Sequence, residues 1–75
     1  MKVYTLTETI DYAGSNILGI YATAVRAKEA CWQEAEAYES RLRIDEDGST
    51  EDGNNMSIRV GTVVFHVDEH EVVGA

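Results

Sequence analysis

The chain has little of what a disulfide framework, a membrane span or an enzyme needs. Cys31 is the only cysteine among 75 residues, so no internal disulfide can form, and such a chain suits a reducing compartment. The first residues lack the long apolar run of a signal peptide, and no window approaches the length of a membrane span. No catalytic signature is present. These absences predict a cytoplasmic protein that is not an enzyme and uses no cofactor.

Positive charge is scarce too, and it is unevenly placed. Six Lys and Arg residues oppose 14 Asp and Glu residues, which gives a net charge of −8. Residues 1–28 carry three cations against two acids and sum to +1, whereas residues 29–75 carry twelve acids against three cations and sum to −9. A field of this sign repels nucleic acid and anionic lipid and attracts basic surfaces. We therefore expect a partner protein with a basic surface, and no direct contact with nucleic acid or membrane.

The length allows one domain over residues 1–75, near the small end of what folds without disulfides or metals. A hydrophobic content of 44% supports a modest core and argues against a wholly disordered chain. Such a chain has room for about one helix against one sheet.

The N-terminal part predicts a β-hairpin. Residues 2–10 are rich in β-branched and aromatic types and alternate between two faces, which is typical of a strand. Residues 11–16 have turn chemistry, and residues 17–22 form a second, more apolar strand. We expect Tyr4, Leu6 and Ile10 on one face of the first strand and Val3, Thr5, Thr7 and Thr9 on the other.

A long helix follows. Thr23 stands where an N-cap is expected, directly before a run of helix formers over residues 24–42. The apolar positions at helical spacing are mostly small, so the helix can lie close to a sheet. We interpret Cys31 as one of these core positions and not as a nucleophile, because no His is near it in the helix. The predicted stripe is Ala24, Ala27, Cys31, Ala35, Tyr38 and Leu42.

Residues 56–73 are again strand-like, and Gly61 marks a bulge or a break into two strands. The fold class that follows is α+β, with a small antiparallel sheet of three to four strands and one long helix packed on one face. The order of elements is β-β-α-β or β-β-α-β-β. A single helix leaves the other sheet face wet or paired with a second copy, so a homodimer is expected.

The segment between helix and final strands is strongly acidic. Over residues 45–55, glycines, asparagines and like charges predict a loop. One interpretation is a solvated connector that keeps a small protein soluble. The other is that its carboxylates imitate a phosphate backbone and occupy a groove lined by Lys and Arg. The candidate partner-binding acids are Asp45, Glu46, Asp47, Glu51 and Asp52.

Trp32 lies off the centre of the buried stripe of the predicted helix. Glu36 and Glu39 follow it at i+4 and i+7, on the same side. A half-exposed Trp among acids resembles a binding hot spot, with the acids attracting a basic partner. The alternative is a boundary Trp that covers the sheet edge. We include Trp32, Glu36 and Glu39 among the candidate partner-binding residues.

His66, Asp68 and His70 alternate along the last strand and are expected on one of its faces. Two imidazoles and a carboxylate can bind a divalent ion, but this short pattern arises readily by chance. The other interpretation is the solvent face of a terminal strand. We adopt that one and predict no metal site.

Three segments are similar to a group of small uncharacterised bacterial and phage domains. These domains open with Lys-Val-Tyr-x-Leu-Thr, continue to Leu-Gly-Ile-Tyr and enter a helix containing Ala-Lys-Glu-Ala. The matching segments are Lys2–Thr7, Leu18–Tyr21 and Ala27–Ala30, and Val67–Gly74 looks like the group's final strand. The resemblance implies a fold and no activity, because the group has no assigned chemistry.

In size, acidity and lack of a catalytic motif the chain also resembles phage-encoded inhibitors of bacterial defence systems, the anti-CRISPR proteins in particular. This resemblance rests on general character and assigns no site. Its implication is a non-enzymatic inhibitor that occupies a basic, nucleic-acid-binding surface of a partner such as a CRISPR effector, in the host cytoplasm. The alternative function is a structural or adaptor module that self-associates through its sheet or its helix.

Overall fold

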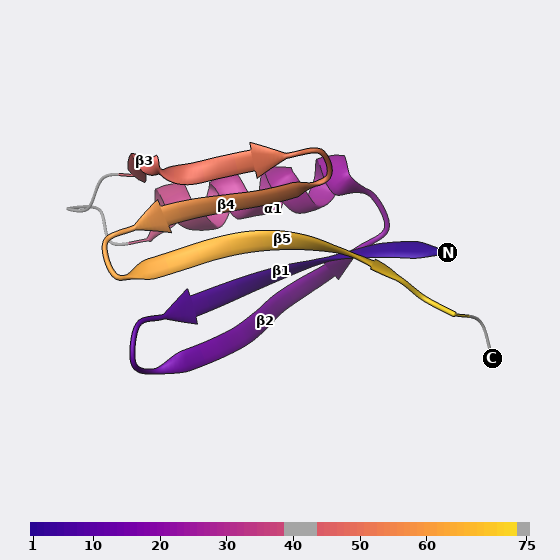
Figure 1. Cartoon of the computed structure of the whole chain (residues 1–75), viewed down its shortest axis with the longest axis horizontal. Helices are drawn as coiled ribbons and strands as arrows, with labels where there is room; N and C mark the ends of the chain where they lie inside the picture. Colours follow the sequence, from indigo (N-terminus) through magenta and orange to yellow (C-terminus); the bar gives the residue numbers. More distant parts are fainter. Residues whose placement is uncertain (39–43, 74–75) are drawn as a thin grey trace.

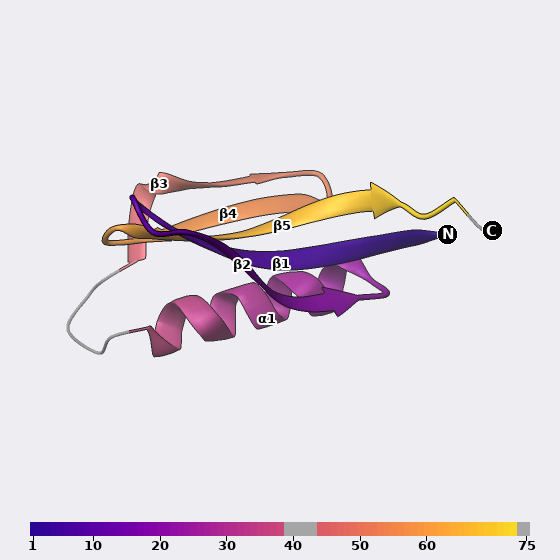
Figure 2. The same cartoon turned by 90° about the horizontal axis from the view of Figure 1, so that it is seen from below.

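The computed structural model describes residues 1–38 and 44–73, and the side chains of all of these except Glu46 and Asp47. One antiparallel sheet and one helix form two layers (Figures 1 and 2). The sheet has five strands in the order β2-β1-β5-β4-β3, and the helix α1 packs on one of its faces. In chain order the elements are β1 (Lys2–Ile10), β2 (Gly14–Tyr21), α1 (Ala24–Ala37), β3 (Ile44–Asp52), β4 (Asn55–Val60) and β5 (Val63–Glu71).

The predicted α+β class with one helix across a sheet is confirmed, but the sheet has more strands than the three or four expected. The additional strand is β3, which comes from the acidic segment. The prediction of a loop over residues 45–55 is therefore wrong up to Asp52. Only Gly53 and Asn54 form the turn to β4, and Gly53 has a positive φ of 60° that suits such a tight turn.

Edge position explains how so acidic a segment becomes a strand. β3 pairs with β4 alone, in a register that places Thr50 opposite Ser57 and Asp52 opposite Asn55. Carboxylates on an edge strand remain in water, so like charge does not prevent the backbone from completing a ladder. Charge patterning alone predicted a loop because it contains no information about the pairing partner.

Of the two other hairpins, the first was predicted, and the second corresponds to one of the two alternatives, a bulge or a break, that were left open at Gly61. β1 pairs antiparallel with β2, although β2 begins at Gly14, two residues before the predicted turn ends. Gly61 has a φ of 62° and lies in the short turn that separates β4 from β5, so the predicted break at this glycine is confirmed. β1 and β5 then pair over their full length, which joins the two ends of the chain at the centre of the sheet.

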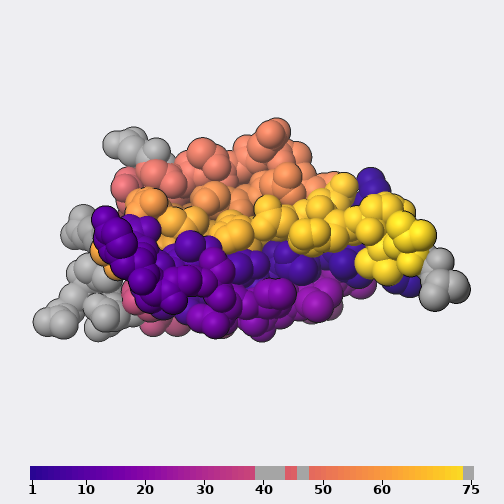
Figure 3. Space-filling model, turned by 60° about the horizontal axis from the view of Figure 1, so that its bottom comes forward, coloured from indigo at the N-terminus to yellow at the C-terminus, as the bar shows by residue number. Residues whose placement is uncertain are grey.

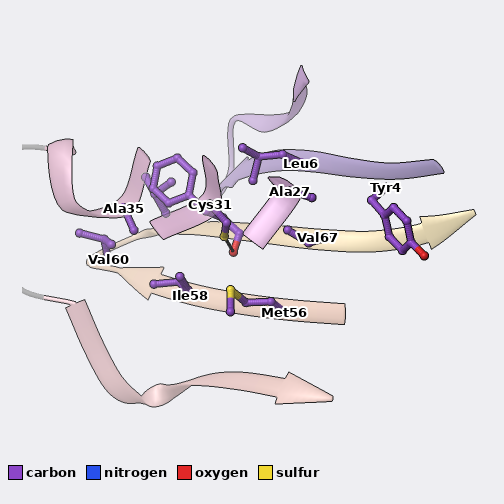
Figure 4. Close-up of a cluster of buried hydrophobic side chains, with 11 residues drawn as sticks. Tyr4, Leu6, Ala27, Cys31, Ala35, Met56, Ile58, Val60 and Val67 are labelled. Carbon is purple, nitrogen blue, oxygen red and sulfur yellow. Dashed lines mark hydrogen bonds between the residues drawn. The ribbon is translucent and has the colours of Figure 1, made fainter. Parts of the chain in front are cut away.

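The core lies between α1 and the sheet (Figure 4). Thr23 caps the helix by accepting a hydrogen bond from the Arg26 backbone at 3.3 Å, as predicted. The helix ends at Ala37, earlier than its composition indicates, because Tyr38 has an extended backbone. The ring of Tyr38 packs edge-on against Phe65 at a centroid distance of 5.6 Å.

The predicted small-residue stripe is confirmed within the described residues. Ala27, Cys31 and Ala35 are fully buried, and Leu42 lies outside the described residues. The Cys31 thiol donates to the carbonyl oxygen of Phe65 at 3.5 Å, and burial raises the pKa of this thiol to about 12. It is therefore a protonated core residue. The sheet contributes Tyr4, Leu6, Met56, Ile58, Val60, Val63, Phe65 and Val67.

The opposite face of the sheet, which Figure 1 shows in front of α1, is not covered by the helix. We call it the open face. Its central strands present hydroxyl, imidazole and carboxylate side chains, because every second residue of β1 and β5 points away from the core. Within the described part of the chain, no helix combines the length and the apolar character that crossing a membrane requires.

Candidate functional site

The acidic strand β3 contains an irregular stretch that its own side chains stabilise. The pairing register with β4 shifts between Asp45 and Thr50. Within the shift, the Gly48 backbone N–H donates to the Asp45 carboxylate at 3.1 Å, and the Ser49 hydroxyl donates to the Asp45 carbonyl at 2.6 Å. The Ser49 hydroxyl in turn accepts from the Arg59 backbone N–H at 3.1 Å, so a side chain satisfies this N–H beside the register shift. Asp45 is thus both an exposed carboxylate and a structural acceptor.

The predicted acids do not share one face. Glu51 is opposite Met56, on the side of the helix, and its carboxylate lies 2.7 Å from the Lys28 ammonium. Asp52 is opposite Asn55 and lines the open face. The side chains of Glu46 and Asp47 are not described, although both residues belong to β3. The structure therefore arranges carboxylates around the edge of a sheet and not along a loop.

Lys28 links the helix to the hairpin of β3 and β4, which we call the acidic hairpin. Lys28 was not among the predicted site residues. Besides the ion pair with Glu51, its ammonium donates to the carbonyl oxygen of Gly53 at 2.6 Å. The signal was weak, because 25 residues separate Lys28 from Gly53. One helix cation thus neutralises one acid of β3 and fixes the turn that follows it.

Trp32 lies where helix and acidic hairpin meet. It is 42% exposed and lines a depression of about 270 Å³ together with Ile44, Glu51 and Ile58. The structure thus brings two predicted residues together, Trp32 and Glu51, although they come from different elements. Glu36 is exposed one helical turn further on, and Glu39 lies outside the described residues. Trp32 therefore covers the sheet margin and still presents ring surface to solvent.

A larger hollow of about 430 Å³ lies on the open face, between β1 and the acidic hairpin. Asp11, Asp52 and Asp68 contribute carboxylates to it, and Arg59 contributes one guanidinium. Arg59 lies 3.8 Å from Asp11, so part of the negative charge is compensated within the molecule. Asp52 is the predicted site residue that faces this hollow.

His66, Asp68 and His70 share the open face, as predicted, but they belong to two separate networks. His66 lies between Thr9, at 3.1 Å from one ring nitrogen, and Asp68, at 2.8 Å from the other. His70 instead pairs with the Thr5 hydroxyl at 2.9 Å. In the described part of the chain, no group of three or more His, Cys, Asp or Glu is placed to hold a metal ion.

The order Thr9, His66, Asp68 is that of a hydroxyl, an imidazole and a carboxylate in a nucleophile relay. Such chemistry also needs donors that stabilise an oxyanion, either backbone N–H groups or side chains. Neighbouring strands pair with β1 and β5 on both sides, so their backbone groups are engaged in the sheet. We interpret the three groups as a network that satisfies polar side chains at the centre of the open face. Thr9 was not predicted to belong to this network, because 57 residues separate it from His66.

Glu69 connects the acidic hairpin to the centre of the sheet. Its carboxylate accepts from the Asn54 side chain at 2.7 Å and lies 3.3 Å from the Lys2 ammonium. These partners, Asn54 first, hold the pKa of Glu69 below its ordinary value, and Glu69 raises the pKa of Lys2. Because Asn54 lies in the turn after β3, this contact fixes that end of the hairpin on β5.

The candidate site is therefore the acidic edge strand β3. The half-exposed Trp32 lies on its helix side, and the polar hollow lies on the open face. The resemblances to small phage domains and to anti-CRISPR proteins remain predictions. Comparison with models of protein families, with curated proteins and with solved structures found no match for this chain.

Proposed function

We propose that the protein is a non-enzymatic, acidic inhibitor. It binds a basic, nucleic-acid-binding surface of a partner protein through the edge strand β3. The observation that carries this proposal is the position of the acids on an edge strand. Asp45 and Asp52 are exposed there, and neither forms an ion pair with a cation within the described residues. Exposed carboxylates that no described cation neutralises are able to pair with Lys and Arg of another protein, although Asp45 also accepts a hydrogen bond from the Gly48 backbone N–H.

Charge density along the strand supports mimicry of a phosphate backbone. From Asp45 to Asp52 the strand spans roughly 23 Å at about 3.3 Å per residue, before any shortening by its register shift. One strand of B-DNA carries about seven phosphates over the same rise. These eight residues carry five carboxylates. A groove that binds phosphates would therefore meet carboxylates at a comparable spacing along the edge, although Glu51 and Asp52 lie on different faces and Glu51 is paired with Lys28.

Trp32 supplies a contact of a different kind. Its ring borders the depression beside Glu51, so an apolar or cationic side chain of the partner can pack there while the acids bind its surroundings. The Lys28–Glu51 ion pair reduces the contribution of Glu51, so Asp45 and Asp52 are the stronger acidic contacts within the described residues. The partner class that this chemistry selects is a nucleic-acid-binding protein such as a CRISPR effector.

The test begins with partners captured from a host lysate and continues with binding kinetics at two salt concentrations. Nucleic acid should displace the captured partner, because both compete for one basic groove. Neutralising Asp45 and Asp52 to Asn should slow association and flatten its salt dependence. The control is Glu34→Gln, which changes an exposed helix carboxylate outside both hollows.

Trp32→Ala should act on the other rate constant and speed dissociation, because loss of a buried anchor acts mainly on dissociation. If the Asp45/Asp52 variant binds as tightly as the parent at low salt, the mimicry proposal fails. β3 would then be only a solubilising edge of the sheet.

A further inference from the structure

β2 is the second edge of the sheet, and it lacks the charged side chains that protect β3. Its eight residues include no charged side chain and no proline. Among the residues that the structure describes, β1 is its only neighbour in the sheet, so the outward backbone groups of Gly14–Tyr21 are open to a further strand. Natural edge strands usually carry charge, proline or a covering segment to prevent such pairing. Figure 3 is viewed from this side, with β2 at the front.

Apolar side chains gather on this edge. Ile17 is 66% exposed, Ile20 is 64% exposed and Leu18 is 40% exposed. Ile17 and Ile20 are opposite Thr7 and Thr5 of β1, which places both on the open face. On the helix side the ring of Tyr21 lies against Gly19, where an added Cβ would be 2.9 Å from it. A strand this apolar presents more than singly scattered surface residues.

The charge distribution selects the occupant of this edge. A second copy also carries −8, so two copies meet most readily where each is least negative. β2 carries no charged side chain, whereas Asp45–Asp52 of β3, at the opposite edge of the sheet, include five acidic residues. A partner selected by basic charge finds nothing to bind on β2. An uncharged, apolar strand is instead complementary to a second copy of itself.

We propose that two copies of the chain pair through their β2 strands, antiparallel and about a two-fold axis. The two sheets then continue as one sheet of ten strands, with β3 at both outer edges. The exposed Ile17, Leu18 and Ile20 of each copy pack against those of the other. The inference is independent of the function proposed for β3, which the pairing leaves accessible.

The register of β2 limits the strength of this pairing. Leu18 has no partner in the β1–β2 register, so a bulge interrupts the strand. A bulge bends an edge and shortens the ladder that another strand can form. The dimer is therefore weak, and side-chain burial by the apolar residues contributes much of its stability.

Sedimentation of the full chain over a concentration series, at low and at high salt, tests the proposal. We expect the average mass to rise from one chain towards two, and to do so at lower concentration in high salt, since salt screens the repulsion between acidic copies. Ile17→Lys should weaken dimerisation by about tenfold or more, because two lysines would meet at the shared edge. Val25→Lys is the matched control, since Val25 is 67% exposed on α1.

A second measurement locates the contact. Hydrogen exchange of the β2 amides should slow with concentration in the parent chain and in Val25→Lys, and not in Ile17→Lys. A monomer at every concentration and salt overturns the proposal, and so does equal dimerisation of Ile17→Lys and parent. If Val25→Lys alone is monomeric, the helix and not β2 forms the interface.

These outcomes are distinguishable from failure of the function proposed for β3. Self-association strengthens with salt, whereas binding of a basic partner weakens with it. Asp52→Asn should leave dimerisation unchanged while it slows association with the partner.

Discussion

The sheet has two edges, and their chemistry is opposite although their topology is equivalent. β3 carries carboxylates, a register shift and a turn tied to Lys28 and Glu69. β2 carries exposed isoleucines and no charge. Both strands have an irregular register, but only β3 also carries charged side chains, which oppose further strand pairing there. At β2 the outward backbone N–H and C=O groups remain available for pairing with another strand. This difference is the basis for proposing one surface for a basic partner and another for a second copy.

The largest expected effect comes from the core that supports both edges. Phe65 lies on the interior strand β5, is almost fully buried and contacts Tyr38. Phe65→Ala should lower the free energy of unfolding by about 3–5 kcal/mol, through lost burial and the cavity that remains. Urea denaturation measures this loss. Phe65→Leu serves as the milder variant, and Ile17→Ala, at an exposed edge position, should change stability by less than about 0.5 kcal/mol. Equal losses at the two positions would contradict the packing described.

Local periodicity explains how much of this fold the sequence predicts. The β1–β2 hairpin, the stripe around Cys31 and the break at Gly61 each depend on residues close in the chain, and each is found. β3 was missed because the prediction depended on its charge and its breaker residues, although it pairs with the adjacent β4 across a two-residue turn. Its turn is held by Lys28 and by Glu69, neither of which is adjacent in the sequence.

The sequence suggested which residues belong to the candidate site, but not how they are arranged in space. The half-exposed position of Trp32 follows from its place on the helical wheel, and the structure confirms it. That Glu51 joins Trp32 while Asp52 faces the open side depends on strand alternation within β3. A segment interpreted as a loop carries no such alternation, so the sequence could not separate these two acids.

A smaller effect is expected where β3 bends. The Ser49 hydroxyl accepts from the Arg59 backbone N–H and donates to the Asp45 carbonyl. Ser49→Ala removes both bonds and leaves a partly buried N–H without its partner, so unfolding should become easier by about 1 kcal/mol. Amide exchange at Arg59 should accelerate more than exchange at neighbouring positions. Ser57→Ala is the control on the facing strand, and an identical response in both variants would contradict the role given to Ser49.

Acid pH should loosen the acidic hairpin before the rest of the sheet. Because Asn54 and Lys2 lower the pKa of Glu69 below its ordinary 4.5, the stability from Glu69 is present above that value. It is lost as pH falls through the lowered pKa of the folded state. Thermal melts from pH 7 into this acid range should show the loss in the parent chain. Glu69→Gln should remove this component of the pH dependence. Asn54→Ala should weaken it, and an unchanged profile in both variants would exclude the contact as its source.

The smallest effect on stability is expected for Asp52→Asn on the acidic strand β3. Comparing this variant with Ile17→Lys on β2 distinguishes the two edges most clearly. Asp52 is exposed and forms no ion pair with a described cation, so Asp52→Asn should change the free energy of unfolding by no more than about 0.5 kcal/mol. The same variant should slow association with a basic partner, because exposed charges act mainly on encounter. Ile17→Lys should show the reverse, with partner association intact and self-association lost. Melting curves, rates of association with the partner and self-association of both variants, measured side by side, test these opposite effects. A stability loss in Asp52→Asn comparable to that of Ser49→Ala would mean that the carboxylate supports the fold, and its proposed freedom to bind another protein would be wrong.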